Sequence, residues 1–314
     1  MSKRKTAEQS TVEQSVVIPT NSELLRLRWV LEGLARQVTG QPWELIVVAD
    51  TTETHGEADC ANLKAMLQEF AERLPNCDAL RLAHLPFKSD ANEFRAGQAR
   101  NMGIKLARGR QVLFLDQDCI PGSDWLESHG AFIGSGEKDG TPGKAAFGMR
   151  RLYPQSKFEE FHNYFDLNGM LPYTDGDARQ MAETVFAANW FSCNASAPRA
   201  ALLEVGGFDE SYGGAWGSED MDLGRRLKRH GVEVADMRTC GGVIHLDHPH
   251  RHFDGPTEAA NGETWEERKA RTFADTNPIV ANGGPLQQLG YEAAETITAL
   301  SVPQNEAIEQ PKQD

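Results

Sequence analysis

Four short apolar runs alternate with helix-length segments over the first 115 residues of this chain of 314. The runs occupy residues 16–18, 45–48, 79–82 and 112–115. Leucines at helical spacing follow the first run, and the patterns at 58–74 and 92–108 also predict helices. Strands that alternate with helices pair in parallel through right-handed crossovers. The pattern therefore predicts an α/β fold with a mostly parallel central sheet flanked by helices.

Polar residues follow three of these predicted strands at the point where each strand ends. They are Pro19, Thr20 and Asn21 after the first run, Asp50 after the second, and Asp116, Gln117 and Asp118 after the fourth. Ligands of such sheets bind outside the carboxyl ends of the strands. We therefore expect these residues to converge on one cleft. Beyond residue 121 the pattern is looser, and it predicts a strand at 145–152 and a helix at 219–229.

The pair Asp116 and Asp118 has the spacing of a cation site. Residues two apart in an extended backbone point to the same side, so the two carboxylates can face one ligand. Oxygen donors suit Mg²⁺ or Mn²⁺, which keep open positions for substrate phosphates. An isolated Asp-x-Asp is more often a solvated acidic turn. Its place after the fourth strand of a strand–helix series favours the functional interpretation.

Ala-Arg-Asn-Met-Gly at residues 99–103 leads through a helix and Gly109 into the strand before Asp116. This order resembles the family 2 glycosyltransferases, which have the GT-A fold. The resemblance implies that the nucleotide-sugar donor contacts Arg100, the strand-end residues Pro19, Thr20, Asn21 and Asp50, and Asp116 with Gln117. Taken alone, Arg100 reads more simply as a charge on a helix surface. The chain departs from the family after Asp50, where it has Thr-Thr-Glu.

A second block contains Gly-Gly-Phe-Asp-Glu at residues 206–210 and Trp-Gly-Ser-Glu-Asp-Met-Asp-Leu at residues 216–223. It resembles the carboxy-terminal half of galactosyltransferases and polypeptide N-acetylgalactosaminyltransferases. The resemblance places Trp216 and Gly217 near the sugar and the acceptor, and Glu219 with Asp220 at the reaction centre. Acidic residues also favour helix N-termini for purely electrostatic reasons. That simpler interpretation does not explain the preceding glycines and tryptophan.

Four histidines lie within residues 245–252. GT-A enzymes often add a downstream histidine to the metal shell, and the resemblance favours His245, which follows an apolar pair, with His248 as the alternative. Neutral imidazole prefers Mn²⁺ to Mg²⁺, so we expect manganese at this site, with Mg²⁺ as the alternative. The same histidines would also suit a solvated loop.

These features together predict a metal-dependent glycosyltransferase that moves a sugar from a nucleotide-sugar, expected to be a UDP-sugar, to an acceptor hydroxyl. Asp220 would be the general base of an inverting reaction, and Glu219 would hold a sugar by hydrogen bonds. The acceptor is left open among a glycan, a lipid-linked sugar, a peptide and a small molecule. One alternative is a sugar-phosphate nucleotidyltransferase, although the first strand lacks the Gly-rich basic loop that binds triphosphate. The other is a carbohydrate-binding protein that keeps the fold without catalysis.

Composition limits the partners and the compartment. The formal net charge of -14 argues against a nucleic-acid partner. The five cysteines form no Cys-x-x-Cys pair, which favours reduced thiols in a cytoplasmic protein. No stretch approaches the ~20 apolar residues of a membrane span, and the polar start lacks the apolar core of a signal peptide. We therefore expect no integral membrane association.

The same patterns suggest an organisation along the chain. We expect a flexible tail over residues 1–14 and a nucleotide-sugar-binding half over 15–120. Residues 121–255 would form the acceptor and catalytic half of the same domain. Residues 256–314 would form a C-terminal extension, and its polar end at 304–314 is expected to be disordered.

Overall fold

The computed structural model describes most of the chain in nine segments. These are residues 12–21, 23–90, 93–134, 143–148, 150–153, 190–214, 217–237, 240–246 and 262–298. The predicted disorder at 304–314 lies outside these segments. The expected tail reaches less far than residue 14, because Val12 is buried and Gln14 already begins the first strand. Gln14 is tolerated there because its side chain donates a hydrogen bond to the carbonyl of Leu126.

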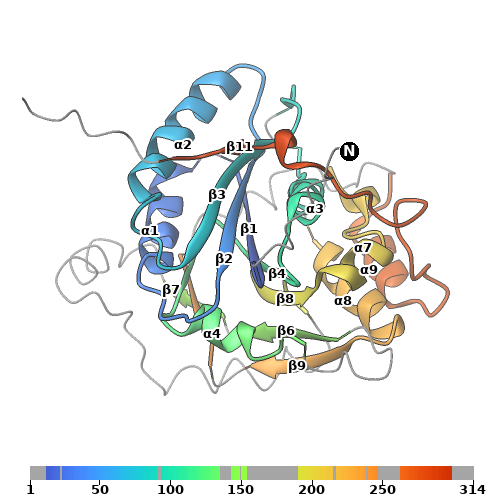
Figure 1. The fold of residues 1–314 in the computed structure, drawn as a ribbon. Coiled ribbons are helices and arrows are strands. Elements are labelled where there is room, and N and C mark those ends of the chain that lie inside the picture. The colour runs from blue at the N-terminus through green and yellow to red at the C-terminus, as the bar shows by residue number, and fades with distance from the viewer. Residues whose placement is uncertain are drawn as a thin grey trace, which may run out of the picture.

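An eight-stranded sheet runs through the centre of the molecule (Figure 1). Its parallel part has the order β3 (Cys77–His84), β2 (Trp43–Ala49), β1 (Gln14–Thr20) and β4 (Gln111–Leu115). Beyond β4 follow β8 (Asn194–Pro198), β6 (Lys144–Gly148) and β9 (Glu233–Met237). β8 is antiparallel to both of its neighbours, and β6 pairs in parallel with β9. The four predicted strands and the α/β fold class are confirmed.

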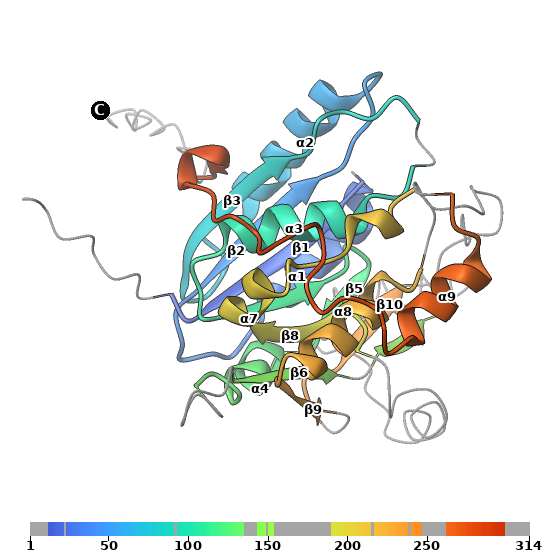
Figure 2. The ribbon, with the colours of Figure 1, turned by 90° about the vertical axis from the view of Figure 1, so that its right-hand side faces the viewer.

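Helices cover both faces of this sheet (Figures 1 and 2). One face carries α1 (Leu24–Leu34) and α2 (Gly56–Phe70), and the other carries α3 (Ala96–Leu106), α7 (Arg199–Glu204) and α8 (Glu219–Arg229). The alternation of β1 explains the two layers, since Val16 and Ile18 pack in the first core and Val17 packs in the second. The predicted helices exist, but α2 ends earlier than expected at Phe70 and α3 begins later, at Ala96.

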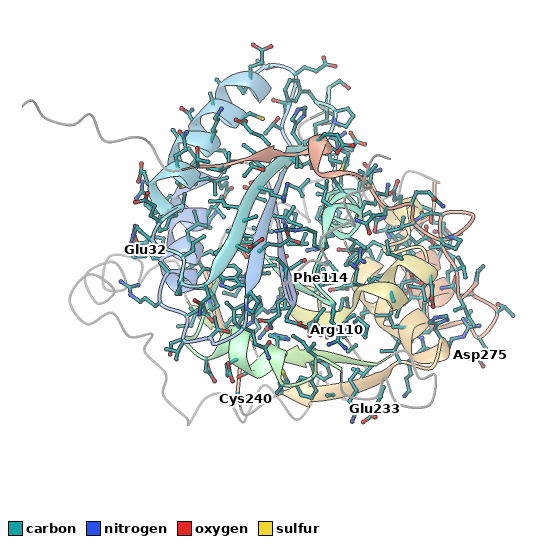
Figure 3. All side chains as sticks on the ribbon, in the orientation of Figure 1. Glu32, Arg110, Phe114, Glu233, Cys240 and Asp275 are labelled. Carbon is teal, nitrogen blue, oxygen red and sulfur yellow. The ribbon has the colours of Figure 1, made fainter. Side chains whose placement is uncertain are left out.

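The second core contains an aromatic cluster built on the central sheet. Phe114 of β4 lies in the interior, whereas the labelled Glu32, Glu233 and Asp275 lie at the periphery (Figure 3). The ring centroid of Phe114 lies 5.7 Å from that of Trp190 and 5.4 Å from that of Phe208, and both contacts are edge to face. Such pairs add stability beyond the buried area. The cluster ties the Gly-Gly-Phe segment before α8 to the strand that precedes Asp116.

A three-stranded sheet lies beside the carboxyl end of β4. It has the order β5 (Cys119–Pro121), β10 (Val243–Leu246) and β7 (Arg150–Tyr153), and α4 (Trp125–Gly130) follows β5. The single strand predicted at 145–152 is therefore wrong, because β6 and β7 belong to different sheets. β6 ends at Gly148, where a side chain would come within 2.4 Å of Asn194 Nδ2. This tertiary contact has no signal in the local sequence.

The C-terminal segment packs back onto the domain (Figure 2). It contains α9 (Trp265–Phe273), the short helix η5 (Tyr291–Ala293) and β11 (Glu295–Thr296), which joins the sheet edge antiparallel to β3. Backbone bonds hold it along its length, from Ala281 to Val205 at 3.0 Å and from Leu289 to Lys105 at 2.9 Å. Among the helices within the described segments, none has the length and apolar character needed to cross a membrane.

A buried polar network supports the antiparallel part of the sheet. His129 Nδ1 lies 2.9 Å from Ser196 Oγ, and its Nε2 lies 3.0 Å from Asn194 Oδ1. The same oxygen of Asn194 accepts a bond from the indole nitrogen of Trp125, while its amide donates to the carbonyl of Gly241. Burial lowers the pKa of His129 to about 4, so the ring is neutral in the folded protein.

We expect His129 to make the protein acid-sensitive between pH 6.5 and 4. The unfolded chain takes up a proton near the ordinary pKa of 6.5, whereas the folded chain resists protonation down to about 4. His129 should therefore contribute a loss of stability of roughly 3 kcal/mol as the pH falls through this window. In His129→Gln, which keeps a polar group at the site, this contribution should be absent, so the pH dependence of stability should differ from that of the unsubstituted chain by this amount, although the baseline stability is lower. Urea denaturation across the window measures the slope. The exposed His55→Gln is the control, and an unchanged slope in His129→Gln would contradict the assignment.

Candidate active site

The carboxyl ends of the central strands meet at one place, as predicted. The hydroxyl of Thr20 donates to Gln117 Oε1 at 2.6 Å, and the amide of Gln117 donates to Asn21 Oδ1 at 2.6 Å. The backbone N–H of Asp50 donates to the carbonyl of Thr20 at 2.7 Å. Pro19 occupies the penultimate position of β1, next to Thr20. Three strands distant in the chain therefore contribute to one edge.

Asp50 is held by two cations that sequence reasoning missed. Lys88 Nζ lies 3.1 Å from Asp50 Oδ2, and Arg95 donates to Asp50 Oδ1 through Nε at 2.9 Å. All three side chains are largely buried. Two positive charges facing one carboxylate leave a local positive excess, which suits an anionic ligand although the whole chain is acidic. Arg95 stands just before the first residue of α3, and its backbone is not helical.

Arg100 joins the two acidic motifs, which are about a hundred residues apart in the chain. Its guanidinium bonds Asp116 Oδ1 at 2.7 Å and lies 3.5 Å from Glu219 Oε1. The side chain is buried and its charge also lies 5.4 Å above the ring of Phe208. The surface-charge interpretation of Arg100 is therefore wrong. This one side chain brings the end of β4 to the beginning of α8.

The first residues of α8 form an acidic centre with shifted protonation. Burial, with the neighbouring charge of Glu219, raises the pKa of Asp220 to about 7. Burial also raises the pKa of Glu219, against the attraction of Arg100. Among the described residues, Glu219 Oε2 has no hydrogen-bond partner, and neither has the hydroxyl of Ser218. Two buried polar atoms thus remain available to a ligand beside a carboxyl group poised near neutral pH.

Asp118 and His245 come together across the small sheet. Cys119 pairs with His245 in the antiparallel ladder of β5 and β10, and Leu246 N–H donates to the carbonyl of Asp118 at 2.8 Å. His245 Nε2 consequently lies 3.6 Å from Asp118 Oδ1. The ligand atoms of Asp118, Cys119 and His245 all lie within 4.8 Å of one another. The predicted pair is therefore in reach of one ion, whereas His248 lies outside the described residues.

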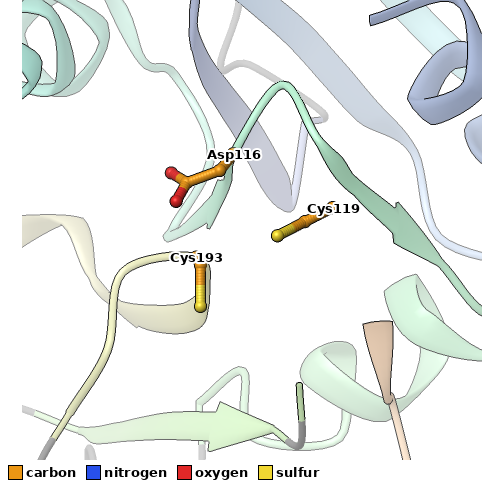
Figure 4. A group of neighbouring side chains, drawn as sticks. All are labelled: Asp116, Cys119 and Cys193. Atoms are coloured by element: carbon orange, nitrogen blue, oxygen red, sulfur yellow. The ribbon is translucent and has the colours of Figure 1, made fainter. Parts of the chain in front are cut away.

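Two thiols, which sequence reasoning did not select, lie beside the carboxylate of Asp116 (Figure 4). Asp116, Cys119 and Cys193 have ligand atoms within 4.8 Å of one another. Burial raises the pKa of Cys119 well above its usual range, so its sulfur stays protonated and is a poor ligand for hard cations. Carboxylate oxygen and imidazole nitrogen fit Mn²⁺ better. Cys119 follows Asp118 directly in the sequence. Cys193 comes close to Asp116 only through the pairing of β4 with β8.

The turn before the acidic centre requires a glycine at position 217. Gly217 has φ +105, and a side chain there would meet the ring of Trp265 at 2.5 Å. Ser218 follows in the left-handed region with φ 75 and precedes the first turn of α8. The predicted acceptor residue Trp216 lies outside the described residues. Trp265 was not predicted, because nothing in the sequence around it signals a contact with residue 217.

Comparison with known proteins shows the family of this chain. The model of glycosyl transferase family 2 matches residues 15–192, more than half of the chain. The chain belongs to glycosyl transferase family 2. A second model, described as the N-terminal domain of galactosyltransferase, matches residues 178–249 of this family 2 chain. Its fold is the GT-A fold, as the resemblance implied.

Curated relatives of this family 2 chain are longer than it is. Validoxylamine A glucosyltransferase from Streptomyces hygroscopicus subsp. jinggangensis is 30% identical over 251 residues, covering 73% of this chain and 54% of that protein. Hyaluronan synthase from Pasteurella multocida is 24% identical over 284 residues, covering 82% of this chain and 27% of that protein. The chain thus spans about half, or less, of the length of these relatives.

Solved structures resemble the family 2 chain at lower identity. S. aureus TarS 1-349 in complex with UDP-GlcNAc has a TM-score of 0.48 at 16% identity, covering 78% of this chain and 61% of that one. A mannosyltransferase from Pyrobaculum calidifontis in complex with GDP-Man and Mn2+ has a TM-score of 0.49 at 16% identity, covering 86% and 65%.

We expect the charge of Asp220 to reduce the stability of the protein. Folding favours the protonated form, so the cost of ionised Asp220 grows as the pH rises from the ordinary pKa of 3.8 to about 7. Asp220→Asn removes this cost and leaves an oxygen to accept the bond from Met221 N. The melting temperature of Asp220→Asn should exceed that of the unsubstituted chain by several degrees at pH 8, at about 2 to 4 °C per kcal/mol, and by less at pH 5.

Differential scanning calorimetry at the two pH values tests this expectation. The exposed Asp275→Asn is the matched control and should melt like the unsubstituted chain at both. A destabilised Asp220→Asn at pH 8 would contradict the assigned burial of the charge.

Proposed function

We propose that this chain transfers a sugar from a nucleotide diphosphate sugar, a UDP-sugar, to an acceptor hydroxyl with inversion at the anomeric carbon. The observation that carries the proposal is the bridge from Arg100 to both Asp116 and Glu219. It gives the donor side and the acceptor side of one reaction a common centre. Membership of family 2 favours glycosyl transfer over the nucleotidyl transfer that the Asp-x-Asp pair alone would also allow.

The donor would bind at the joined strand ends. Pro19, Thr20 and Asn21, with Gln117, form the edge that would face the nucleoside, beside Asp50. Because Lys88 and Arg95 already bond Asp50, its carboxylate is oriented before any ligand arrives. Their excess positive charge would attract the diphosphate. This arrangement offsets the overall negative charge of the chain.

Asp118 and His245 would hold a divalent cation, with Asp116 facing the same ligand. Their donor atoms lie 3.6 Å apart, and one oxygen with one imidazole nitrogen suits Mn²⁺. When bound, such a cation neutralises charge that develops on the departing diphosphate. Arg100 would keep Asp116 oriented through its 2.7 Å ion pair. Mg²⁺ remains the alternative ion, and His248 the alternative ligand.

Asp220 would accept the proton of the acceptor hydroxyl. A general base works best when its pKa lies near the operating pH, and burial raises that of Asp220 to about 7. Attack by the acceptor on the side opposite the leaving diphosphate inverts the configuration. Glu219 would position a sugar hydroxyl with Oε2, the oxygen that lacks a bond within the described structure. Gly217 and Trp216 would border the acceptor. A cytoplasmic location completes the proposal, supported by five unpaired cysteines.

The donor side predicts metal-dependent nucleotide binding. UDP with Mn²⁺ should raise the melting temperature, because a ligand at 100 times its dissociation constant stabilises the native state by about 2.7 kcal/mol. UDP alone or Mn²⁺ alone should do much less. Asp118→Ala and His245→Ala should lose the combined effect, and His230→Ala, away from this cluster, should keep it. A thermal-shift titration measures the difference, and an unchanged response in both site variants would refute the metal assignment.

The acceptor side predicts a base-dependent turnover. Asp220→Asn should lower kcat by about 10²- to 10⁴-fold, the usual contribution of a general base, while its UDP and Mn²⁺ response stays normal. In the unsubstituted chain, activity should fall as the pH falls through about 7, because the base must be ionised. The assay is sugar transfer or donor hydrolysis over a panel of UDP-sugars. Full turnover in Asp220→Asn would remove Asp220 as the base.

A further inference from the structure

Trp265 is an aromatic residue beside the acidic centre in a part of the chain that neither family model covers. The two matches end at residues 192 and 249, whereas Trp265 is the first residue of α9. Its ring lies against Gly217, two positions before Glu219. Trp265 is 36% exposed, so more than a third of this large residue faces solvent next to the proposed reaction centre.

The backbone at the start of α9 is fixed by local hydrogen bonds. The hydroxyl of Thr264 accepts a bond from Glu267 N, and the Glu267 carboxylate accepts one from Thr264 N, which completes a capping box. This pair satisfies two otherwise unpaired donors of the helix terminus. The backbone position of Trp265, the first residue of the helix, is therefore set by the chain itself.

The rest of α9 is bonded to the loop before α8 and to α8 itself. Arg271 donates to Asp209 Oδ2 at 2.9 Å and stacks 4.0 Å above the ring of Tyr212. Just beyond the helix, Asn277 donates to Asp222 Oδ1 at 2.5 Å. These bonds attach α9 and the residues just after it to α8 and to the segment before α8.

Arg268 lies near the indole ring of Trp265. Its guanidinium carbon lies 5.8 Å from the ring centroid of Trp265, and the side chain is only 2% exposed. The charge of Glu219 acts on this guanidinium, so Trp265, Arg268 and Glu219 are neighbours. A cation next to an aromatic ring is favourable, and the residue remains 36% exposed with this cation in place.

We propose that the exposed part of Trp265 is the stacking platform for a pyranose ring of the acceptor. The inference rests on the proposed function and extends it to the chemical class of the acceptor. A six-membered ring offers a face of C–H groups to the indole and hydroxyls at its rim. The hydroxyl of Ser218 and Glu219 Oε2, both buried and without partners among the described residues, supply polar contacts for that rim. An acceptor held there would present a hydroxyl towards Asp220.

A purely structural role for Trp265 is the competing interpretation, since the indole also covers Gly217. Two substitutions separate the roles. Trp265→Leu keeps an apolar cover over Gly217 but lacks an aromatic face, and Trp265→Phe keeps such a face. Phe273→Ala is the matched control, because Phe273 lies on the same helix, is 40% exposed and packs on Arg225 instead.

The test is saturation-transfer NMR with three probes: the methyl β-D-pyranosides of glucose, galactose and N-acetylglucosamine. Titrations are made on the protein alone and on the protein with UDP and Mn²⁺. The unsubstituted chain should bind at least one probe and transfer saturation most strongly to ring C–H protons. Trp265→Leu should raise the dissociation constant of that probe by about fivefold or more, the effect of losing one aromatic contact. In Trp265→Phe and Phe273→Ala the dissociation constant should stay within about twofold of that of the unsubstituted chain.

The platform is refuted if no probe binds the unsubstituted chain, if Trp265→Leu binds as tightly as Trp265→Phe, or if Phe273→Ala weakens binding equally. These outcomes differ from a failure of the proposed function. Binding of a pyranoside requires neither donor nor turnover, whereas the proposed function fails when UDP with Mn²⁺ leaves the melting temperature unchanged.

Discussion

The ion pairs of Arg100 organise the whole site, because they hold together two acidic segments that would otherwise repel. Asp116 ends β4 and Glu219 begins α8, and the guanidinium lies between them, buried, within 2.7 Å and 3.5 Å of their oxygens. Removing one partner of a buried pair leaves an uncompensated charge, which is strongly destabilising. The geometry of the acidic centre therefore depends on α3, the helix that carries Arg100.

Electrostatics in this protein are arranged locally, against the overall charge of -14. Lys88 and Arg95 create a positive excess where the strands end. Burial raises the pKa of Asp220 to about 7. In the proposed function, the anionic donor and the acceptor hydroxyl would therefore meet different local fields. The net charge predicts solubility and the classes of partner to exclude, but it does not predict either field.

The C-terminal segment changes the interpretation of where the domain ends. Residues beyond 262 complete the sheet edge through β11 and wall the site through α9. Their polar composition suggested a C-terminal extension. In the structure, polar side chains of this segment make tertiary contacts, such as the hydrogen bond from Arg271 to Asp209. Trp265 belongs to this segment and lies against Gly217. No periodic pattern in the sequence predicts that contact.

Local periodicity was enough to predict the parallel core, and short motifs with a chemical reason for their spacing pointed to the strand-end residues and to both acidic motifs. The family resemblance pointed to His245. Tertiary contacts were needed to find the bonds of Lys88 and Arg95 to Asp50, the thiols of Cys119 and Cys193, the split of residues 145–152 and the position of Trp265. Each of these features depends on which distant segments pack against one another. That packing is set by the buried surface and the hydrogen bonds of the whole domain, and a short stretch of sequence does not contain this information.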